Sequence, residues 1–185
     1  MYDVAIPTPP FHIRFTGVWD MQDLYECMVN WFRMKKYKFQ EKNYKHKHPS
    51  PFGVERQYVF DASKEETEYI SVNYTVYMHE YDAHDVEVTM KDGSKRVFTQ
   101  GRLWAELKVE VRYDPKKRWN ENKFFFYLKD FYNKYIILKR FMEGYAPKFR
   151  TEVFELHALM RERLYMEHQA FGYRYFGGSS HRKSL

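Results

Sequence analysis

The side chains best suited to chemistry lie at positions 79–85, which read HEYDAHD. Imidazole nitrogens and carboxylate oxygens bind divalent transition metals. The candidate ligands are His79, Asp82, His84 and Asp85. Their spacing matches no specific metal-binding motif, and polar residues are common in turns between strands. We therefore expect a solvated connection between two strands, with a metal site as the alternative, and we expect no cofactor.

A second group of side chains is basic and lies at positions 42–48. Its members are Lys42, Lys45, His46, Lys47 and His48. Lysine-rich strands are typical of sheet edges, where positive charge blocks pairing with another chain. Aromatic residues among cations, here Phe39 and Tyr44, are also typical of a nucleic-acid contact. The sequence leaves both interpretations open, with RNA as the partner in the second.

The remaining reactive groups favour no catalytic function. Glu106 and Glu110 lie on one face of a predicted strand, where two carboxylates could act as acid and base. Lys108 and Arg112 neutralise them on a wet face, so nothing indicates a desolvated pair. Cys27 lies on a predicted helix and is expected to be a small buried apolar residue. We predict no catalytic residue and no enzymatic activity.

The composition limits the class of protein. The chain has 31 basic and 25 acidic residues, and its net charge of +6 is below that of a dedicated nucleic-acid binder. The single cysteine excludes a disulfide framework and a cysteine zinc site. No apolar run reaches the roughly 18 residues of a membrane span, and the first residues lack a secretory signal. We expect an intracellular, cytoplasmic protein, or a virion component if the source is viral.

Alternating apolar and polar residues predict the strands that position these groups. The predicted strands are 11–16, a strand that opens at 37–41 and becomes polar at 42–48, 54–60, 70–78, 86–90, and a return strand that begins at Val97 and alternates along 103–111. Asp92-Gly93 predicts a tight hairpin turn, because both central positions of such a turn need positive φ. One apolar and one charged face along these strands favour an antiparallel sheet with one solvated side.

Three segments have helical periodicity. Asp20 is a predicted N-cap for a helix that ends near Met34 and turns Leu24, Met28 and Trp31 inward. The segment 122–142 has a long aromatic stripe, and we expect the sheet to cover it. The stripe contains Phe124, Leu128, Phe131, Tyr135, Leu138 and Met142. A last helix is predicted at 149–168.

The predicted fold is α+β: a curved antiparallel sheet of about six strands on a long C-terminal helix, with one further helix near the N-terminus and one at the C-terminus. Over residues 11–168 this order resembles the helix-grip domains of the START and Bet v 1 type. That family shows two short helices after its first strand, where this sequence predicts one. The resemblance implies a pocket for an apolar ligand. The segments WDMQDLYECMVNWF and FYLKDFYNKYI are also similar to parts of uncharacterised small archaeal proteins.

The domain is expected at 11–169, between an extended proline-rich arm at 1–10 and a Gly/Ser-rich basic tail at 170–185. The predicted contact residues of the tail are Tyr173, Tyr175, Phe176, Arg182 and Lys183. Seventeen Tyr, sixteen Phe and four Trp indicate a core of large side chains or a large partner-facing surface. We expect a non-enzymatic subunit of a filament, virion or ribonucleoprotein that contacts itself or other proteins. The alternatives are a START-like binder of an apolar ligand and an RNA- or ribosome-associated factor.

Overall fold

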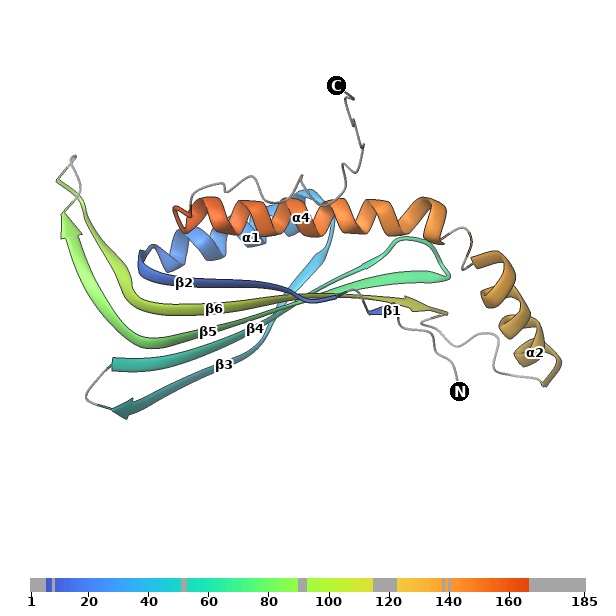
Figure 1. The fold of residues 1–185 in the computed structure, drawn as a ribbon, viewed down its shortest axis with the longest axis horizontal. Helices are drawn as coiled ribbons and strands as arrows, with labels where there is room; N and C mark the ends of the chain where they lie inside the picture. The colour runs from blue at the N-terminus through green and yellow to red at the C-terminus, as the bar shows by residue number, and fades with distance from the viewer. Residues whose placement is uncertain are drawn as a thin grey trace, which may run out of the picture.

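One antiparallel sheet runs through the described part of the chain, and two helices lie on one of its faces (Figure 1). The structure is a computed structural model that describes residues 6–7, 9–50, 53–89, 93–114, 123–137, 139 and 141–166. The strands are β1 (Ile6–Pro7), β2 (Phe11–Trp19), β3 (Lys38–Ser50), β4 (Gly53–Glu65), β5 (Ile70–Thr89) and β6 (Lys95–Tyr113). The helices are α1 (Met21–Met34), α2 (Lys123–Tyr132) and α4 (Ala146–Arg163), with π-helical turns at Asn133–Ile137 and Phe141–Tyr145.

The sheet is five strands wide. β6 pairs with β5 on one side, and β4 and β3 follow in that order. The other side of β6 pairs with β2 and, near its C-terminal end, with the short strand β1. Because β1 and β2 share one position, the six paired strands make a sheet of only five positions. The predicted α+β class and antiparallel sheet are confirmed, and the expected width of about six strands is wrong.

β5 is one continuous strand, where the sequence predicted two strands and a solvated connection at 79–85. Its residues pair with β6 on both sides of a β-bulge between Tyr81 and His84. β6 has 19 residues against 20 in β5, and Thr89 pairs with Lys95 across the hairpin predicted around Gly93. The connection was predicted wrongly because a run of polar residues is compatible with a bulged strand as well as with a turn.

Helix α1 forms as predicted. The Asp20 carboxylate accepts a hydrogen bond from the backbone N–H of Asp23 at 3.0 Å and caps the first turn. Leu24, Met28 and Trp31 are buried against the sheet. The local pattern of this segment therefore agrees with its packing.

The helix that covers the sheet beside α1 is α4, and the segment 122–142 does not cover it (Figure 1). Phe149, Val153, Leu156 and Met160 are buried, as the predicted inner face of the last helix requires. The described residues of this segment include α2, the π-helical turn Asn133–Ile137 and the start of the π-helical turn Phe141–Tyr145, and α2 lies beyond the end of the sheet. Its apolar periodicity was real, but periodicity does not determine which helix the sheet covers.

The core lies between the sheet, α1 and α4. Its largest fully buried side chains include Trp19, Phe32, Phe60, Tyr74 and Phe149. No helix of the described residues is long and apolar enough to cross a membrane. In the predicted N-terminal arm, Ile6 and Pro7 pair with β6.

Candidate functional site

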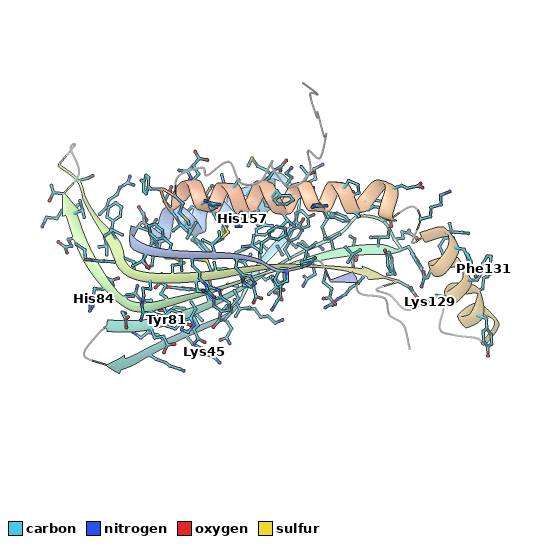
Figure 2. All side chains as sticks on the ribbon, viewed as in Figure 1. Lys45, Tyr81, His84, Lys129, Phe131 and His157 are labelled. Atoms are coloured by element: carbon cyan, nitrogen blue, oxygen red, sulfur yellow. The ribbon has the colours of Figure 1, made fainter. Side chains whose placement is uncertain are left out.

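The face of the sheet opposite the helices is open and has one row of side chains that crosses every long strand. Lys45 pairs with Gln57, Gln57 with His79, His79 with Trp104, and Trp104 with Arg14. Directly paired residues point to the same face, and adjacent strands lie about 4.8 Å apart, so this cross-strand row is about 19 Å long. In Figure 2, Lys45 and Tyr81 lie on the side away from α1 and α4.

Five rings form an aromatic patch in the middle of this face. The patch consists of His12, Tyr77, His79, Tyr81 and Trp104. The Trp104 ring is stacked on His12 at 6.0 Å and contacts Tyr77 edge-on at 5.4 Å between centroids. His79 lies 3.8 Å from Tyr81 between centroids. Burial raises the pKa of Tyr77, so its hydroxyl stays protonated at neutral pH. The patch joins β2, β5 and β6 in one continuous aromatic surface.

Two hollows lie beside the patch and together form a trough. The first has a volume of about 510 Å³, and the side chains around it include Arg14, Thr16, Tyr81, Arg102 and Trp104. The second has a volume of about 390 Å³ and shares Thr16 and Arg102 with the first. It continues to Asp82, His84 and Gln100. These volumes fall within the range of small-molecule sites.

The bulge in β5 places Tyr81 and Asp82 at the trough, and two glycines make room for it. A Cβ atom at Gly53 would lie 2.6 Å from the Asp82 carbonyl carbon. A Cβ atom at Gly101 would lie 2.9 Å from the backbone carbonyl oxygen of Tyr81. Asp82 itself has a positive φ of 50°. The strands on both sides of β5 therefore need glycine where the bulge approaches them.

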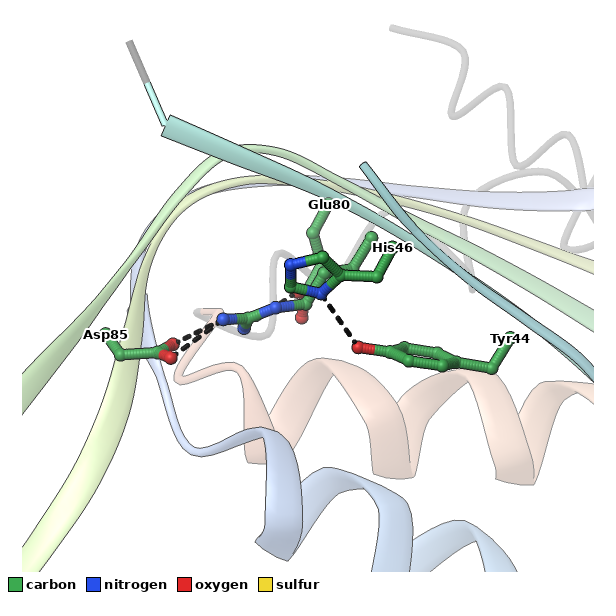
Figure 3. Close-up of polar contacts among 5 residues, drawn as sticks. Tyr44, His46, Glu80 and Asp85 are labelled. Atoms are coloured by element: carbon green, nitrogen blue, oxygen red, sulfur yellow. Dashed lines mark hydrogen bonds and ion pairs between the residues drawn. The ribbon is translucent and has the colours of Figure 1, made fainter. Parts of the chain in front are cut away.

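Arg56 holds the bulge through Glu80 and Asp85, which lie on the helix side of the sheet (Figure 3). Its Nη2 donates to both Asp85 oxygens at 2.8 and 2.9 Å, and its Nη1 donates to Glu80 Oε2 at 3.4 Å. Glu80 precedes the bulge and Asp85 follows it. Burial raises the pKa of the Glu80 carboxyl, and the neighbouring Arg56 partly offsets this effect. One guanidinium thus ties both ends of the bulge together.

The structure does not bring the four candidate metal ligands together. His79 is hydrogen-bonded to Glu55 on the open face, Asp82 to Arg102, and Asp85 to Arg56 on the opposite face. His84 is exposed and lines the trough. Within the described ranges, no group of three or more His, Cys, Asp and Glu residues could hold a metal ion.

The basic segment lies in β3, which is an edge strand of the sheet. Lys42 forms an ion pair with Asp61 at 3.0 Å, and the His46 ring is hydrogen-bonded to the Tyr44 hydroxyl at 3.1 Å (Figure 3). Lys45 and Lys47 are exposed and have no ion pair with any residue that the structure describes. His48 continues the same strand. The sequence therefore identified one end of the cross-strand row.

The other groups predicted from the sequence add no residue to the aromatic patch or to the trough. Glu106 forms an ion pair with Lys108 at 3.0 Å, and Glu110 forms one with Arg112 at 2.7 Å. Cys27 is partly exposed, so its predicted burial is wrong. The tail residues Tyr173, Tyr175, Phe176, Arg182 and Lys183 lie outside the described residues.

Sequence reasoning missed Arg14, Tyr77, Tyr81 and Trp104 as members of a site. The signal for Tyr77 and Trp104 was an aromatic residue at a polar position of a predicted strand, where solvent-facing side chains are normally small or charged. Arg14 gave no such signal, and Tyr81 lay in the predicted connection at 79–85. A scan of the chain against protein-family models finds no matching family, and a search of curated proteins finds no matching relative.

Proposed function

We propose that this chain is a non-enzymatic RNA-binding subunit of a ribonucleoprotein and that it binds single-stranded RNA across the open face of its sheet. The cross-strand row carries this proposal. It has an exposed lysine at one end, an exposed arginine at the other, and the partly exposed Trp104 ring between them, beside the buried ring of His79. This arrangement matches the two requirements of single-strand binding, rings that stack on bases and cations that contact phosphates.

The charges on the open face favour an anionic ligand at the ends of the row. Arg14 and Lys45 form no ion pair within the described part of the chain. Two carboxylates on the same face already have partners, since Glu55 is hydrogen-bonded to His79 and Glu106 forms an ion pair with Lys108. A phosphate at Arg14 or Lys45 would therefore meet a cation that no carboxylate of the described residues neutralises.

The core argues against the alternative of a START-like binder of an apolar ligand. Trp19, Phe60 and Phe149 are at most 1% exposed and pack between the sheet and the helices. The Tyr37 and Tyr74 hydroxyls meet Glu152 in the same layer. Large side chains and a polar cluster at the position of the expected pocket favour a packed core.

The test is fluorescence anisotropy with a labelled RNA of about 12 nucleotides, a length within the range of known single-strand sites. We expect saturable binding by the natural chain. Because loss of one stacked base costs about 1–3 kcal/mol, Trp104→Ala should weaken binding by about tenfold or more. Lys139→Gln, which removes an exposed charge next to the π-helical turns and outside the cross-strand row, should leave the affinity unchanged. An RNA that does not bind the natural chain would overturn the proposal.

Helix α2 supports a second function, assembly with another copy of this chain. Its polar side faces the body of the protein: Lys129 contacts Asp114, and Asn133 just after the helix accepts a 2.5 Å hydrogen bond from Tyr69. Among the side chains that the structure describes, Tyr127, Leu128 and Phe131 of α2 and Tyr135 of the following π-helical turn are exposed. A stripe of this kind on two copies can pack about a two-fold axis.

Light scattering after size exclusion tests this second candidate. We expect the mass of a dimer for the natural chain and of a monomer for Phe131→Asp, with Lys139→Glu as the control. A monomer at all concentrations of the natural chain would exclude α2 as a self-association surface.

A further inference from the structure

We infer that the trough holds one unstacked nucleotide, with its base against Trp104 and Tyr81 and its phosphate between Arg14 and Arg102. This inference rests on the proposed RNA-binding function and specifies which part of the open face takes a single base. The larger hollow measures about 510 Å³ and is open to solvent. The residues that line it include the aromatic residues Phe15, Tyr81 and Trp104 and the two arginines Arg14 and Arg102.

The pairing of rings with guanidinium groups selects the class of ligand. A purely apolar ligand would cover the Arg14 guanidinium without giving it a partner, which is costly. A simple anion would make no contact with the rings of Trp104 and Tyr81. A nucleotide satisfies both kinds of wall, because it joins a flat aromatic base to an anionic phosphate.

Arg14 and Arg102 differ in how freely their guanidinium groups can turn toward a phosphate. Arg14 is exposed and has no ion pair within the described residues, so its guanidinium can turn toward a phosphate. Arg102 is bonded to Asp82 and lies 5.9 Å from the centroid of the Tyr81 ring. These contacts hold the Arg102 side chain in one orientation, and its remaining N–H groups can still donate to a phosphate oxygen.

The second hollow supplies groups for the edge of the base. It adjoins the first at Thr16 and contains Asp82, His84 and Gln100, which offer both donors and acceptors. A base in a duplex is stacked and paired and cannot present its edge in this way. The trough therefore favours unpaired RNA over a duplex.

The experiment compares three probes: adenosine 5′-monophosphate, single-stranded RNA of about 12 nucleotides, and the same RNA as a duplex. Binding of the mononucleotide is measured by calorimetry and that of both RNAs by anisotropy. Thr16→Tyr is the main variant, because it fills the trough at an exposed strand position without removing a charge. Ser63→Tyr adds the same ring at an exposed position of β4 outside the trough and is the matched control.

We expect the natural chain to bind the mononucleotide and to prefer the single strand over the duplex. Thr16→Tyr should weaken binding of the mononucleotide and of the single strand by about tenfold, and Ser63→Tyr should leave both unchanged. Arg14→Gln provides an independent variant if Thr16→Tyr does not fold, with the same expected direction. The mononucleotide arm separates a site for free nucleotides from a site that needs the RNA chain, since the latter binds the mononucleotide much more weakly than the RNA.

Three outcomes distinguish the inference from the proposed function. If single-stranded RNA binds the natural chain and Thr16→Tyr equally well, the trough inference is wrong and the RNA-binding function stands. If the mononucleotide binds both proteins equally well, its site lies elsewhere and the inference is also wrong. If neither the RNA nor the mononucleotide binds, the inference and the proposed function both fail.

Discussion

The Tyr37 hydroxyl donates a 2.7 Å hydrogen bond to Glu152 Oε2, which joins the residue before β3 to the buried side of α4 across 115 positions of sequence. The Tyr74 hydroxyl of β5 donates to the same oxygen at 3.2 Å. Burial, together with this carboxylate, raises the pKa of both tyrosines. Both hydroxyls therefore remain donors at neutral pH, and α4 is fixed on the sheet by polar as well as apolar contacts.

We predict that Glu152→Ala lowers the free energy of unfolding by about 3 kcal/mol, because it leaves two buried hydroxyls without this acceptor. Glu155→Ala, which removes a half-exposed carboxylate of the same helix, should change it by at most about 0.5 kcal/mol. Urea unfolding at neutral pH measures both effects. Equal midpoints for the two variants would show that the contact contributes no stability.

The close approach of the β5 bulge to Gly53 predicts that alanine at this position destabilises the fold. Gly53→Ala should lower the free energy of unfolding by about 3 kcal/mol, because it combines a positive φ of 134° with a Cβ atom 2.6 Å from the Asp82 backbone. Gly144→Ala is the control, since a Cβ atom there meets nothing within 4 Å. Thermal unfolding of both variants checks this expectation, and a stable Gly53→Ala would mean that β5 is not bulged toward β4.

Glu80 predicts a dependence of stability on pH. Its pKa is raised in the folded chain, so above its ordinary pKa the unfolded chain binds fewer protons than the folded chain. The contribution of Glu80 is therefore complete at acid pH and is lost as the pH rises through its folded pKa. Urea unfolding from about pH 4 to about pH 8 should show this loss in the natural chain and not in Glu80→Gln. Parallel pH profiles of the two proteins would contradict it.

The salt dependence of RNA binding separates phosphate contacts from stacking. Each phosphate contact of a single strand contributes about 0.7 to the slope of log affinity against log salt. Lys45→Gln and Arg14→Gln should each reduce the slope by about this amount, whereas Trp104→Ala should weaken binding and leave the slope unchanged. Anisotropy titrations at several salt concentrations provide the measurement. A slope that neither charge variant alters would place the phosphates elsewhere.

The buried Lys129 of α2 predicts an effect on the free energy of unfolding. Lys129 is 5% exposed and lies 3.0 Å from the equally buried Asp114. Lys129→Ala removes this cation and should lower the free energy of unfolding by about 3 kcal/mol, the cost of breaking a buried pair. Lys139→Ala, at an exposed position, should change it by at most about 0.5 kcal/mol. Matching denaturation curves would mean that α2 is not held by this pair.

The sequence by itself determined the features that depend on near neighbours. Strict alternation along 103–111 predicted the strand β6, and its apolar residues are the buried ones. Asp20 and the spacing of Leu24, Met28 and Trp31 predicted α1 with its cap and its inner face. These patterns are reliable because side-chain direction repeats every two residues in a strand and every 3.6 residues in a helix.

The tertiary structure alone decided which apolar stripe the sheet covers and where the bulge lies. Phe131 is 56% exposed while Phe149 is buried, although both belong to helical stripes of similar spacing. The bulge depends on Gly53, Gly101 and Arg56, which come from neighbouring strands and cannot be related to β5 by local periodicity. The cross-strand row likewise joins Arg14 to Lys45 through the registers of four strand pairs. Register and coverage are set by contacts between segments distant in sequence, so they become fixed only when the whole sheet has formed.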